Sequence, residues 1–282
     1  TNEASTPCHE YPHYPPTNRL IFMKAILLAG GTGSRLMPLT LATSKQLLPV
    51  YNKPLIYYPL STLLLAGVKE ILIISTPRDI GPIENLLGDG DEFGISIKYE
   101  VQAEPKGIAE AVLIGESFLQ GGPFILMLGD NILYGGGLGE SLAQETLASG
   151  AKVFLQKVKN PENYGVAELS KNGTDITSVI EKPKSTRSDL ALVGLYYFDS
   201  TAPDRTKEIL PSHRGELEIT DLIMSYVESS DIDFRILERG ATWLDAGTVE
   251  GLTNASEFVR VVERRQGLLV SSPHEISWRL GL

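Results

Sequence analysis

The chain carries the stretch AILLAGGTGSRL at residues 25–36, and its first part is an uninterrupted apolar run. Such a run is typical of a strand buried on both faces, as in a parallel sheet. Gly30, Gly31 and Gly33 follow and let the backbone turn sharply and approach a bulky ligand. Consecutive N–H groups in such a turn can bind an anion, and Arg35 adds a planar fork suited to phosphate. The stretch predicts a strand followed by an anion-binding loop, although an ordinary strand-exit turn has the same composition.

Two common phosphate-binding patterns do not fit this loop. A dinucleotide fingerprint needs another glycine three residues after Gly33, where Leu36 stands. A Walker loop needs Gly-Lys-Ser/Thr at its end, whereas this loop ends Gly33-Ser34-Arg35. The segments that follow contain prolines and lysines, which predict a stiff, cationic rim; they read PLT (38–40), SKQLLPV (44–50) and KPLIYY (53–58).

The overall composition excludes several classes of protein. The chain has 282 residues and a formal net charge of −10, which argues against a broad nucleic-acid surface but leaves room for a nucleotide pocket with a few local cations. Cys8 is the only cysteine, so no intrachain disulfide can form, as fits a reducing compartment. No apolar stretch approaches the roughly 20 residues that span a bilayer. We therefore expect a cytoplasmic protein without nucleic-acid or membrane partners.

Residues 1–22 differ from the rest of the chain. They hold four prolines and two of the four histidines, and they show no helical period. We expect a disordered extension, a vector-derived remnant or a mis-assigned start, with Met23 as the natural beginning. Cys8, His9 and His13 have no fourth ligand nearby, which argues against a metal site there.

From Met23 onward, strand-like and helix-like segments alternate, which predicts right-handed crossovers and a parallel sheet. Ligands of such sheets collect at the carboxyl ends of the strands, where both the glycine loop and Gly129-Asp130-Asn131 are expected. The second half is richer in strands and includes the hairpin turn Asn172-Gly173. We predict helices at 57–66, 80–87, 107–118, 220–227 and 249–265, and strands at 25–28, 70–75, 95–101, 124–128, 152–157, 166–169, 176–180, 192–198 and 234–237.

Together these segments resemble the sugar-1-phosphate nucleotidylyltransferases, and within them the branch that uses a thymidine nucleotide. The resemblance runs from Met23 to about Trp278 and implies an α/β fold: a mixed, mainly parallel Rossmann-like sheet flanked by helices, of the nucleotide-diphospho-sugar transferase type. It implies one domain over 23–282, with a nucleotide-binding half (about 23–135), a sugar-binding half (about 136–248) and a C-terminal helical region (about 249–282). The remaining motifs that carry it are YEVQAEPKGIAEA (99–111), GDN (129–131), YGV (164–166), EKP (181–183), VGLY (193–196), GELEITD (215–221) and WLDAG (243–247).

The reaction implied by the resemblance is attack by glucose 1-phosphate on the α-phosphorus of dTTP, giving dTDP-glucose and pyrophosphate. The family's product feeds dTDP-rhamnose and other deoxysugar synthesis, and the family's enzyme is a homotetramer. An in-line displacement needs no protein nucleophile, so cations and Mg²⁺ are expected in place of a Ser/His/Asp triad. Two alternatives stay open: a relative that prefers UTP or another sugar phosphate, and a catalytically silent sugar-nucleotide sensor.

The resemblance also assigns roles to single residues. Arg35 and Lys45 would contact the triphosphate, and Lys182 would pair with the phosphate of the sugar. The implied nucleotide-binding residues are Gly30, Gly31, Gly33, Ser34, Arg35, Lys45, Gln46, Gln102, Gly107 and Asp130. The implied sugar-phosphate-binding residues are Asn131, Gly165, Glu181, Lys182 and Val193. Asp130 and Asp245 would hold Mg²⁺, a hard cation that accepts one or two carboxylates together with phosphate oxygens and water.

Two positions in the implied base-reading segment depart from the family, Glu110 and Ile108, the second of which is commonly leucine there. The amide of Gln102 offers a donor and an acceptor to a pyrimidine edge. Glu110, where the family commonly has glutamine, follows about one helical turn after Gly107. Glu110 is therefore interpreted either as a solvated helix residue or as a charge that acts locally on the base site.

Overall fold

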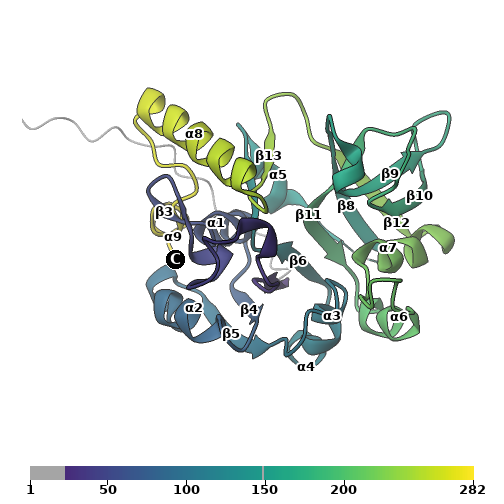
Figure 1. Cartoon of the computed structure of the whole chain (residues 1–282), viewed down its shortest axis with the longest axis horizontal. Helices are drawn as coiled ribbons and strands as arrows, with labels where there is room; N and C mark the ends of the chain where they lie inside the picture. The colour runs from purple at the N-terminus through teal and green to yellow at the C-terminus, as the bar shows by residue number, and fades with distance from the viewer. Residues whose placement is uncertain (1–22, 148) are drawn as a thin grey trace, which may run out of the picture.

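A sheet of nine strands runs through the described part of the computed structural model, which comprises residues 23–147 and 149–282 (Figure 1). Parallel strands form one side of it in the order β6–β1–β4–β5, as predicted from the alternating pattern. Ile26 and Leu27 of β1 are fully buried on opposite faces, which explains why this strand is an unbroken apolar run. The bounds are β1 Lys24–Leu28, β4 Glu70–Ser75, β5 Ser96–Val101 and β6 Phe124–Leu128.

Antiparallel pairing extends the sheet beyond β6, so the predicted mixed sheet is confirmed. Strand β11 (Leu190–Phe198) runs antiparallel to β6, with Leu195 opposite Met127. The pairing register of β11 with β8 shifts between Leu192 and Tyr196. The first part of β11 also pairs with β9. The remaining strands of this sheet are β8 (Ala151–Lys157), β9 (Gly165–Leu169), β10 (Ile176–Glu181) and β12 (Ile232–Ile236).

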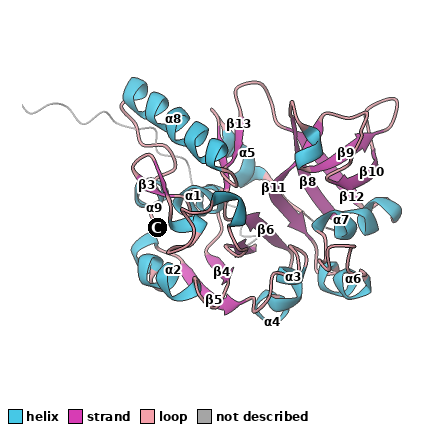
Figure 2. Cartoon of the chain, viewed as in Figure 1, coloured by secondary structure: helices cyan, strands magenta, loops and turns pink. Residues whose placement is uncertain are grey.

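Helices cover both faces of the sheet, as Figure 2 shows with cyan helices on either side of the magenta strands. Ala25 and Leu27 of β1 pack in one apolar cluster with helices α1 (Tyr57–Leu65) and α2 (Ile80–Leu87). The alternate side chains of the strand pack in a second cluster with α3 (Glu110–Ile114), α4 (Glu116–Leu119), α6 (Ala202–Glu208) and α7 (Ile219–Glu228). The two clusters fix the sheet between its helical layers, because each strand buries side chains on both faces.

A separate two-stranded sheet lies beside the large one and was not predicted. Strand β7 (Asn131–Tyr134) pairs antiparallel with β13 (Thr242–Asp245). Helix α8 (Val249–Gln266) packs near β13, and its hydroxyl cap is Thr248, which accepts from the Gly251 N–H at 3.0 Å. Figure 1 shows α8 in yellow along the edge of the molecule that carries β13.

The other elements are short and connect these layers. They are α5 (Leu138–Gln144), α9 (Pro273–Leu280), β2 (Pro49–Val50), β3 (Lys53–Pro54) and the 3-10 turns η1 (Ser34–Leu36), η2 (Lys45–Leu47), η3 (Asp91–Phe93) and η4 (Pro161–Asn163). Among the described residues, none of the helices has the length and apolar character that crossing a membrane requires.

Several predicted boundaries need correction. The helix expected over 107–118 is split into α3 and α4 at Gly115, and it begins only at Glu110. Gly115 lies close to β1, because a Cβ there would come within 2.5 Å of the Ile26 side chain. The helix predicted over 220–227 is one residue longer at each end, because α7 runs from Ile219 to Glu228. The N-terminal extension predicted over 1–22 lies outside the described residues.

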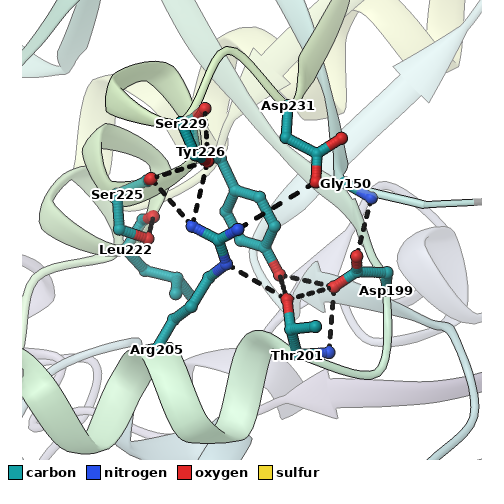
Figure 3. Close-up of polar contacts among 9 residues, drawn as sticks. All are labelled: Gly150, Asp199, Thr201, Arg205, Leu222, Ser225, Tyr226, Ser229 and Asp231. Atoms are coloured by element: carbon teal, nitrogen blue, oxygen red, sulfur yellow. Dashed lines mark hydrogen bonds and ion pairs between the residues drawn. The ribbon is translucent and has the colours of Figure 1, made fainter.

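A polar cluster ties α6 and α7 to the end of β11 and the start of β8 (Figure 3). The buried carboxylate of Asp199 accepts hydrogen bonds from the Gly150 N–H at 2.7 Å, the Thr201 hydroxyl at 2.6 Å and the Tyr226 hydroxyl at 2.9 Å. The guanidinium of Arg205 lies over the Tyr226 ring, 4.0 Å from its centroid. Two helices and two strand ends therefore share one carboxylate.

Candidate active site

The glycine loop leaves the carboxyl end of β1 in the middle of the parallel strands. Gly31 and Gly33 adopt positive φ angles of 97° and 62°, which explains the glycines at both positions. The hydroxyl of Thr40 donates to the Gly33 carbonyl at 2.8 Å and closes the turn. Ser34 and Arg35 begin the short turn η1 and are exposed, so their side chains are accessible to a ligand.

The end of β6 lies next to this loop, as the parallel topology predicts. The Gly129 N–H donates to the Leu28 carbonyl at 2.9 Å, and a Cβ on Gly129 would come within 2.9 Å of that oxygen. The close approach of the two backbones requires glycine here and places Asp130 beside the glycine loop.

The β7–β13 pair brings two distant aspartates together. Asp245 lies opposite Asn131 in the ladder, and the Ala246 N–H donates to the Asp130 carbonyl at 3.0 Å. Burial raises the pKa of the Asp245 carboxyl, and the neighbouring Asp130 carboxylate raises it further. Burial also acts to raise the pKa of Asp130, but Lys45, Asn131 and Arg35 outweigh it and lower that pKa. The two carboxylates are thus close enough to oppose each other's ionisation.

Two positively charged side chains lie beside this carboxylate pair. Lys45, on the turn η2, forms an ion pair with Asp130. Arg35 lies against the backbone after β13, where a Cβ on Gly247 would come within 2.9 Å of its guanidinium Nη2. The charges of Lys45 and Arg35 both act on Asp245 as well as on Asp130. The cluster formed by Arg35, Lys45, Asp130 and Asp245 is called here the charged cluster.

Asn131 is buried and holds Asp130 in place. Its amide Nδ2 donates to Asp130 Oδ1 at 2.9 Å. Its Oδ1 accepts from the Gly194 N–H at 3.1 Å and from the Trp243 indole at 2.5 Å. Both ends of the Asn131 amide therefore form hydrogen bonds within the protein, whereas the sequence predicts that Asn131 contacts the sugar phosphate. That contact stays a prediction, and the orienting hydrogen bonds were missed because they join residues up to 112 positions apart.

The amides predicted for the nucleotide lie on the other side of the glycine loop. Gln46 is buried, and its Nε2 reaches toward the Gly30 carbonyl at 3.4 Å. Gln102 follows β5, and its Oε1 lies 3.0 Å from where a Cβ on Gly30 would stand. Gly107 has a φ of 104°, and a Cβ there would come within 2.2 Å of the Leu217 carbonyl oxygen. Gln46 and Gln102 therefore both lie beside Gly30, and Gln102 also donates to the Gly107 carbonyl at 3.1 Å.

Gly165, Glu181 and Lys182, three of the five residues predicted for the sugar phosphate, lie at the β9–β10 pair. Glu181 stands opposite Gly165 in the ladder, and the Lys182 ammonium lies 2.9 Å from Glu181 Oε1. Lys182 has a φ of 42°, in the left-handed region that is unusual for a lysine. Arg214, which sequence reasoning missed, also reaches Glu181, at 3.5 Å. Val193 is fully buried in β11, so its side chain forms part of the core.

A chain of contacts joins this group to the charged cluster. The Lys182 N–H donates to the Tyr164 carbonyl at 3.0 Å, and the Tyr164 ring packs on Trp243 with a centroid distance of 5.1 Å. Trp243 in turn donates to Asn131. Burial is the largest cause that raises the pKa of the Tyr196 hydroxyl, and the carboxylates of Glu181 and Asp130 raise that pKa further.

The donor set of the charged cluster fits a divalent cation bound together with a ligand. No group of three or more His, Cys, Asp or Glu side chains suited to a metal occurs in residues 23–147 and 149–282. Mg²⁺ commonly uses one or two carboxylates and completes its shell with phosphate oxygens and water. The carboxylates of Asp130 and Asp245 match that requirement.

Comparison with known proteins identifies the family of the chain. Residues 24–261 match the family profile described as nucleotidyl transferase. Glucose-1-phosphate thymidylyltransferases of Mycolicibacterium smegmatis and Neisseria meningitidis are each 49% identical to the chain, over 92% of it and 90% of the relative. A solved Bacillus anthracis structure assigned to the same enzymes, in complex with sucrose, has a TM-score of 0.78 and 39% identity, over 84% of this chain and 95% of that one. A UDP-glucose pyrophosphorylase with bound UDP-glucose shares the fold, with a TM-score of 0.75 at 24% identity over 86% of this chain. The chain therefore belongs to the nucleotidyl transferase family, among the glucose-1-phosphate thymidylyltransferases.

Proposed function

We propose that the protein transfers a deoxythymidylyl group from dTTP to glucose 1-phosphate, giving dTDP-glucose and pyrophosphate. An oxygen of the sugar phosphate attacks the α-phosphorus, and the bond from that phosphorus to the oxygen bridging to the β-phosphate breaks. The name shared by relatives at 49% identity supports this reaction. The observation that carries it is the charged cluster, in which two cations and two carboxylates meet at the end of the parallel strands.

The nucleotide is proposed to lie over the glycine loop. Backbone N–H groups from Gly30 to Ser34 and the exposed Arg35 would bind the triphosphate, since aligned donors neutralise the charge that develops at phosphorus. Lys45 would share its ammonium between Asp130 and the α-phosphate. Gln46 would support the loop, and Gln102 with Gly107 would contact the base.

Magnesium is proposed as the metal, held by Asp130 and Asp245. When bound, Mg²⁺ offsets the repulsion between two polyanionic substrates and stabilises charge at the reacting phosphorus. Asn131 holds the Asp130 carboxylate in a fixed orientation by its 2.9 Å hydrogen bond. Lys45 and Arg35 keep the Asp130 carboxyl ionised by lowering its pKa. The protein would therefore supply a preformed pair of oxygen ligands.

The sugar phosphate is proposed to lie between the charged cluster and the β9–β10 pair. Lys182 would bind the phosphate of glucose 1-phosphate, and Glu181 would accept hydrogen bonds from sugar hydroxyls. Gly165, Val193 and Asn131 would form the adjoining wall. The chain of contacts from Lys182 through Tyr164 and Trp243 to Asn131 supports a single site shared by these two groups.

The cellular setting follows as a further proposal. We place the protein in the cytoplasm, with which its single cysteine is compatible, at the first step of dTDP-rhamnose and related deoxysugar synthesis. We also propose a homotetramer. Large exposed apolar side chains on and near the two C-terminal helices support association, among them Val261, Leu269 and Trp278.

A pyrophosphate-release panel tests the reaction. It crosses dTTP, UTP, CTP, ATP and GTP with several sugar 1-phosphates, in the presence of Mg²⁺. We expect dTTP with glucose 1-phosphate to give the highest kcat/KM and UTP to react more slowly. The thymine methyl is a small apolar contact worth about 1–3 kcal/mol. A clear preference for UTP or another sugar would assign the protein to a related enzyme, and no release with any pair would indicate a sensor.

A further inference from the structure

The side chain of Gln102 is held in one orientation by the protein. Its backbone N–H donates to the Ser75 carbonyl at 2.8 Å, which continues the β4–β5 pairing past the end of β5. The residue is 4% exposed. Its Nε2 donates to Glu110 Oε2 at 2.7 Å and to the Gly107 carbonyl at 3.1 Å. Its Oε1 lies on the opposite side, toward the bare Cα of Gly30 in the glycine loop.

The chemistry of the two partners makes this orientation obligatory. A carboxylate oxygen and a backbone carbonyl oxygen both accept hydrogen bonds, so the group that faces them must donate. Rotating the amide by half a turn would place Gln102 Oε1 against two oxygens at hydrogen-bond distance. Such a mismatch leaves buried polar atoms unpaired, at a cost of about 1–3 kcal/mol each. The acceptor end of the amide therefore faces the glycine loop.

The acceptors themselves are rigidly placed. The Leu217 N–H donates to the Lys106 carbonyl at 2.7 Å, and the Ala109 N–H donates to the Leu217 carbonyl at 3.1 Å. These bonds fix the loop that contains Gly107 against the segment before α7. Glu110 follows at the first position of α3 and is half-buried. Its carboxylate is thus carried by an anchored backbone, and it is not a fully solvated helix residue.

We propose that Glu110 is a positioning residue that determines which pyrimidine the site accepts. By holding Nε2 of Gln102, it presents Oε1 as a hydrogen-bond acceptor toward the base. Thymine and uracil carry a proton on ring N3 and can donate to that oxygen, whereas N3 of cytosine is itself an acceptor. This inference rests on the proposed function, in which Gln102 contacts the base. Among the described residues no donor occupies Gln102 Oε1, which is therefore available for such a contact.

The decisive experiment compares dUTP with dCTP, because these nucleotides differ only at ring position 3 and its exocyclic neighbour. The ratio of their kcat/KM values is measured by pyrophosphate release at saturating glucose 1-phosphate, for the wild type and three variants. Glu110→Leu removes the nearer of the two acceptors that hold Nε2 and leaves only the Gly107 carbonyl, and we expect the dUTP preference to fall by about tenfold. Glu110→Lys offers a donor instead and should favour the reversed amide, so the preference should fall further, toward dCTP. Glu110→Gln can still accept from Nε2 and should keep the wild-type preference.

A matched control comes from the next glutamate along the same segment. Glu116 pairs with Lys207 at 2.7 Å on the surface, so Glu116→Gln changes the charge equally without touching Gln102. We expect its dUTP-to-dCTP ratio to equal that of the wild type. A variant that only loosens the fold would lower both kcat/KM values together and leave the ratio unchanged.

The outcomes separate this inference from the reaction on which it rests. If the wild type releases pyrophosphate with dTTP but Glu110→Leu and Glu110→Lys both keep the wild-type ratio, the positioning role of Glu110 is wrong while the reaction stands. If the wild type itself turns over no thymidine or uridine nucleotide, the proposed function fails first. A loss of selectivity in Glu110→Gln equal to that in Glu110→Leu would contradict the acceptor argument.

Discussion

Asp130 and Asp245 show how one site can shift the pKa values of two carboxyl groups in opposite directions. Lys45, Asn131 and Arg35 stabilise the ionised form of Asp130 against the effect of burial. Asp245 is destabilised in its ionised form by burial and by Asp130. A pair of this kind is expected where a cation binds, because the added positive charge compensates both carboxylates.

We predict that Asp130→Asn or Asp245→Asn lowers kcat by at least about 100-fold, a loss of roughly 2.7 kcal/mol in transition-state stabilisation. Activity should vanish with a chelator and return with added Mg²⁺. Because the pKa of Asp245 is raised on folding, its ionised form costs stability at neutral pH, so Asp245→Asn should not lower the melting temperature. The control is the exposed Asp189→Asn. Near-normal turnover in both site variants would refute the metal pair.

Lys182 combines a proposed phosphate contact with an unfavourable backbone conformation. Its φ of 42° lies in the left-handed region, which costs a residue with a side chain about 1–2 kcal/mol relative to the right-handed one. Such strain occurs where the surrounding structure holds a residue for a function. The 2.9 Å ion pair with Glu181 directs the ammonium toward the β9–β10 pair.

We predict that Lys182→Ala and Lys182→Gly both raise the KM for glucose 1-phosphate and lower kcat, since the ammonium binds and aligns the attacking phosphate. Glycine tolerates positive φ, so Lys182→Gly should melt at a higher temperature than Lys182→Ala, by an amount that corresponds to about 1 kcal/mol. Lys182→Arg should not restore full activity, because a planar fork does not replace a point charge. Wild-type kinetics in Lys182→Ala would remove this residue from the site.

Among the elements, α6 and α7 depend on the buried carboxylate of Asp199. Burial acts to raise the pKa of Asp199, but hydrogen bonds from Thr201, Gly150 and Tyr226 outweigh burial and hold the pKa below its usual range. The lowered pKa means that the ionised carboxylate stabilises the fold. This contribution is present above the pKa of an unfolded aspartate, about 3.9, and is lost as the pH falls through the lower folded value.

We predict that Asp199→Asn lowers the free energy of unfolding at pH 7 by about 1–3 kcal/mol, because an amide cannot accept all of these hydrogen bonds. The variant should also lose less stability than the wild type as the pH falls below about 4. Urea denaturation at several pH values measures both effects. The exposed Asp204→Asn, on the neighbouring helix α6, serves as the control. Equal acid sensitivity of wild type and Asp199→Asn would contradict the role of this carboxylate.

The small β7–β13 sheet brings together two distant segments that carry the proposed metal-binding aspartates. It pairs Asp245 with Asn131 and so joins the end of β6 to a segment more than 100 residues away. Helix α8 then begins directly after this segment, capped by Thr248. The carboxylates proposed to bind the metal are thus brought together by one short antiparallel pairing, supported by the helix that follows it.

In the whole molecule, the described chain leaves large apolar side chains exposed near its C-terminal helices. Trp278 of α9 is 73% exposed and Leu269, between the helices, is 52% exposed. Exposed apolar side chains gathered in one region mark a candidate surface for association. We predict that the protein in solution has a mass four times the 30.8 kDa of one chain, as measured by light scattering after gel filtration. A monomer at micromolar concentration would contradict the proposed tetramer.

The elements that could be predicted are those that local patterns encode. Buried parallel strands are continuous apolar runs, so β1, β4 and β6 were predicted within a residue of their ends. The glycines after β1 need positive φ angles or close backbone approach, requirements that no other residue meets as well. The motifs proposed to bind phosphate, base, sugar and metal could be selected because each is a short stretch of sequence.

What could not be predicted depends on contacts between distant parts of the chain. The four-residue strands β7 and β13 are too short to show a period, and their pairing appears only when the large sheet has formed. Local composition allowed Glu110 to be either solvated or active on the base site, and only the structure shows that its carboxylate accepts a hydrogen bond from Gln102. Likewise, the sequence shows Asn131 only as a polar residue after a strand. In the structure its Oδ1 accepts hydrogen bonds from the Gly194 N–H and the Trp243 indole. Side-chain orientation at the site is set by these long-range partners, because an amide or carboxylate takes the direction that its neighbours can satisfy.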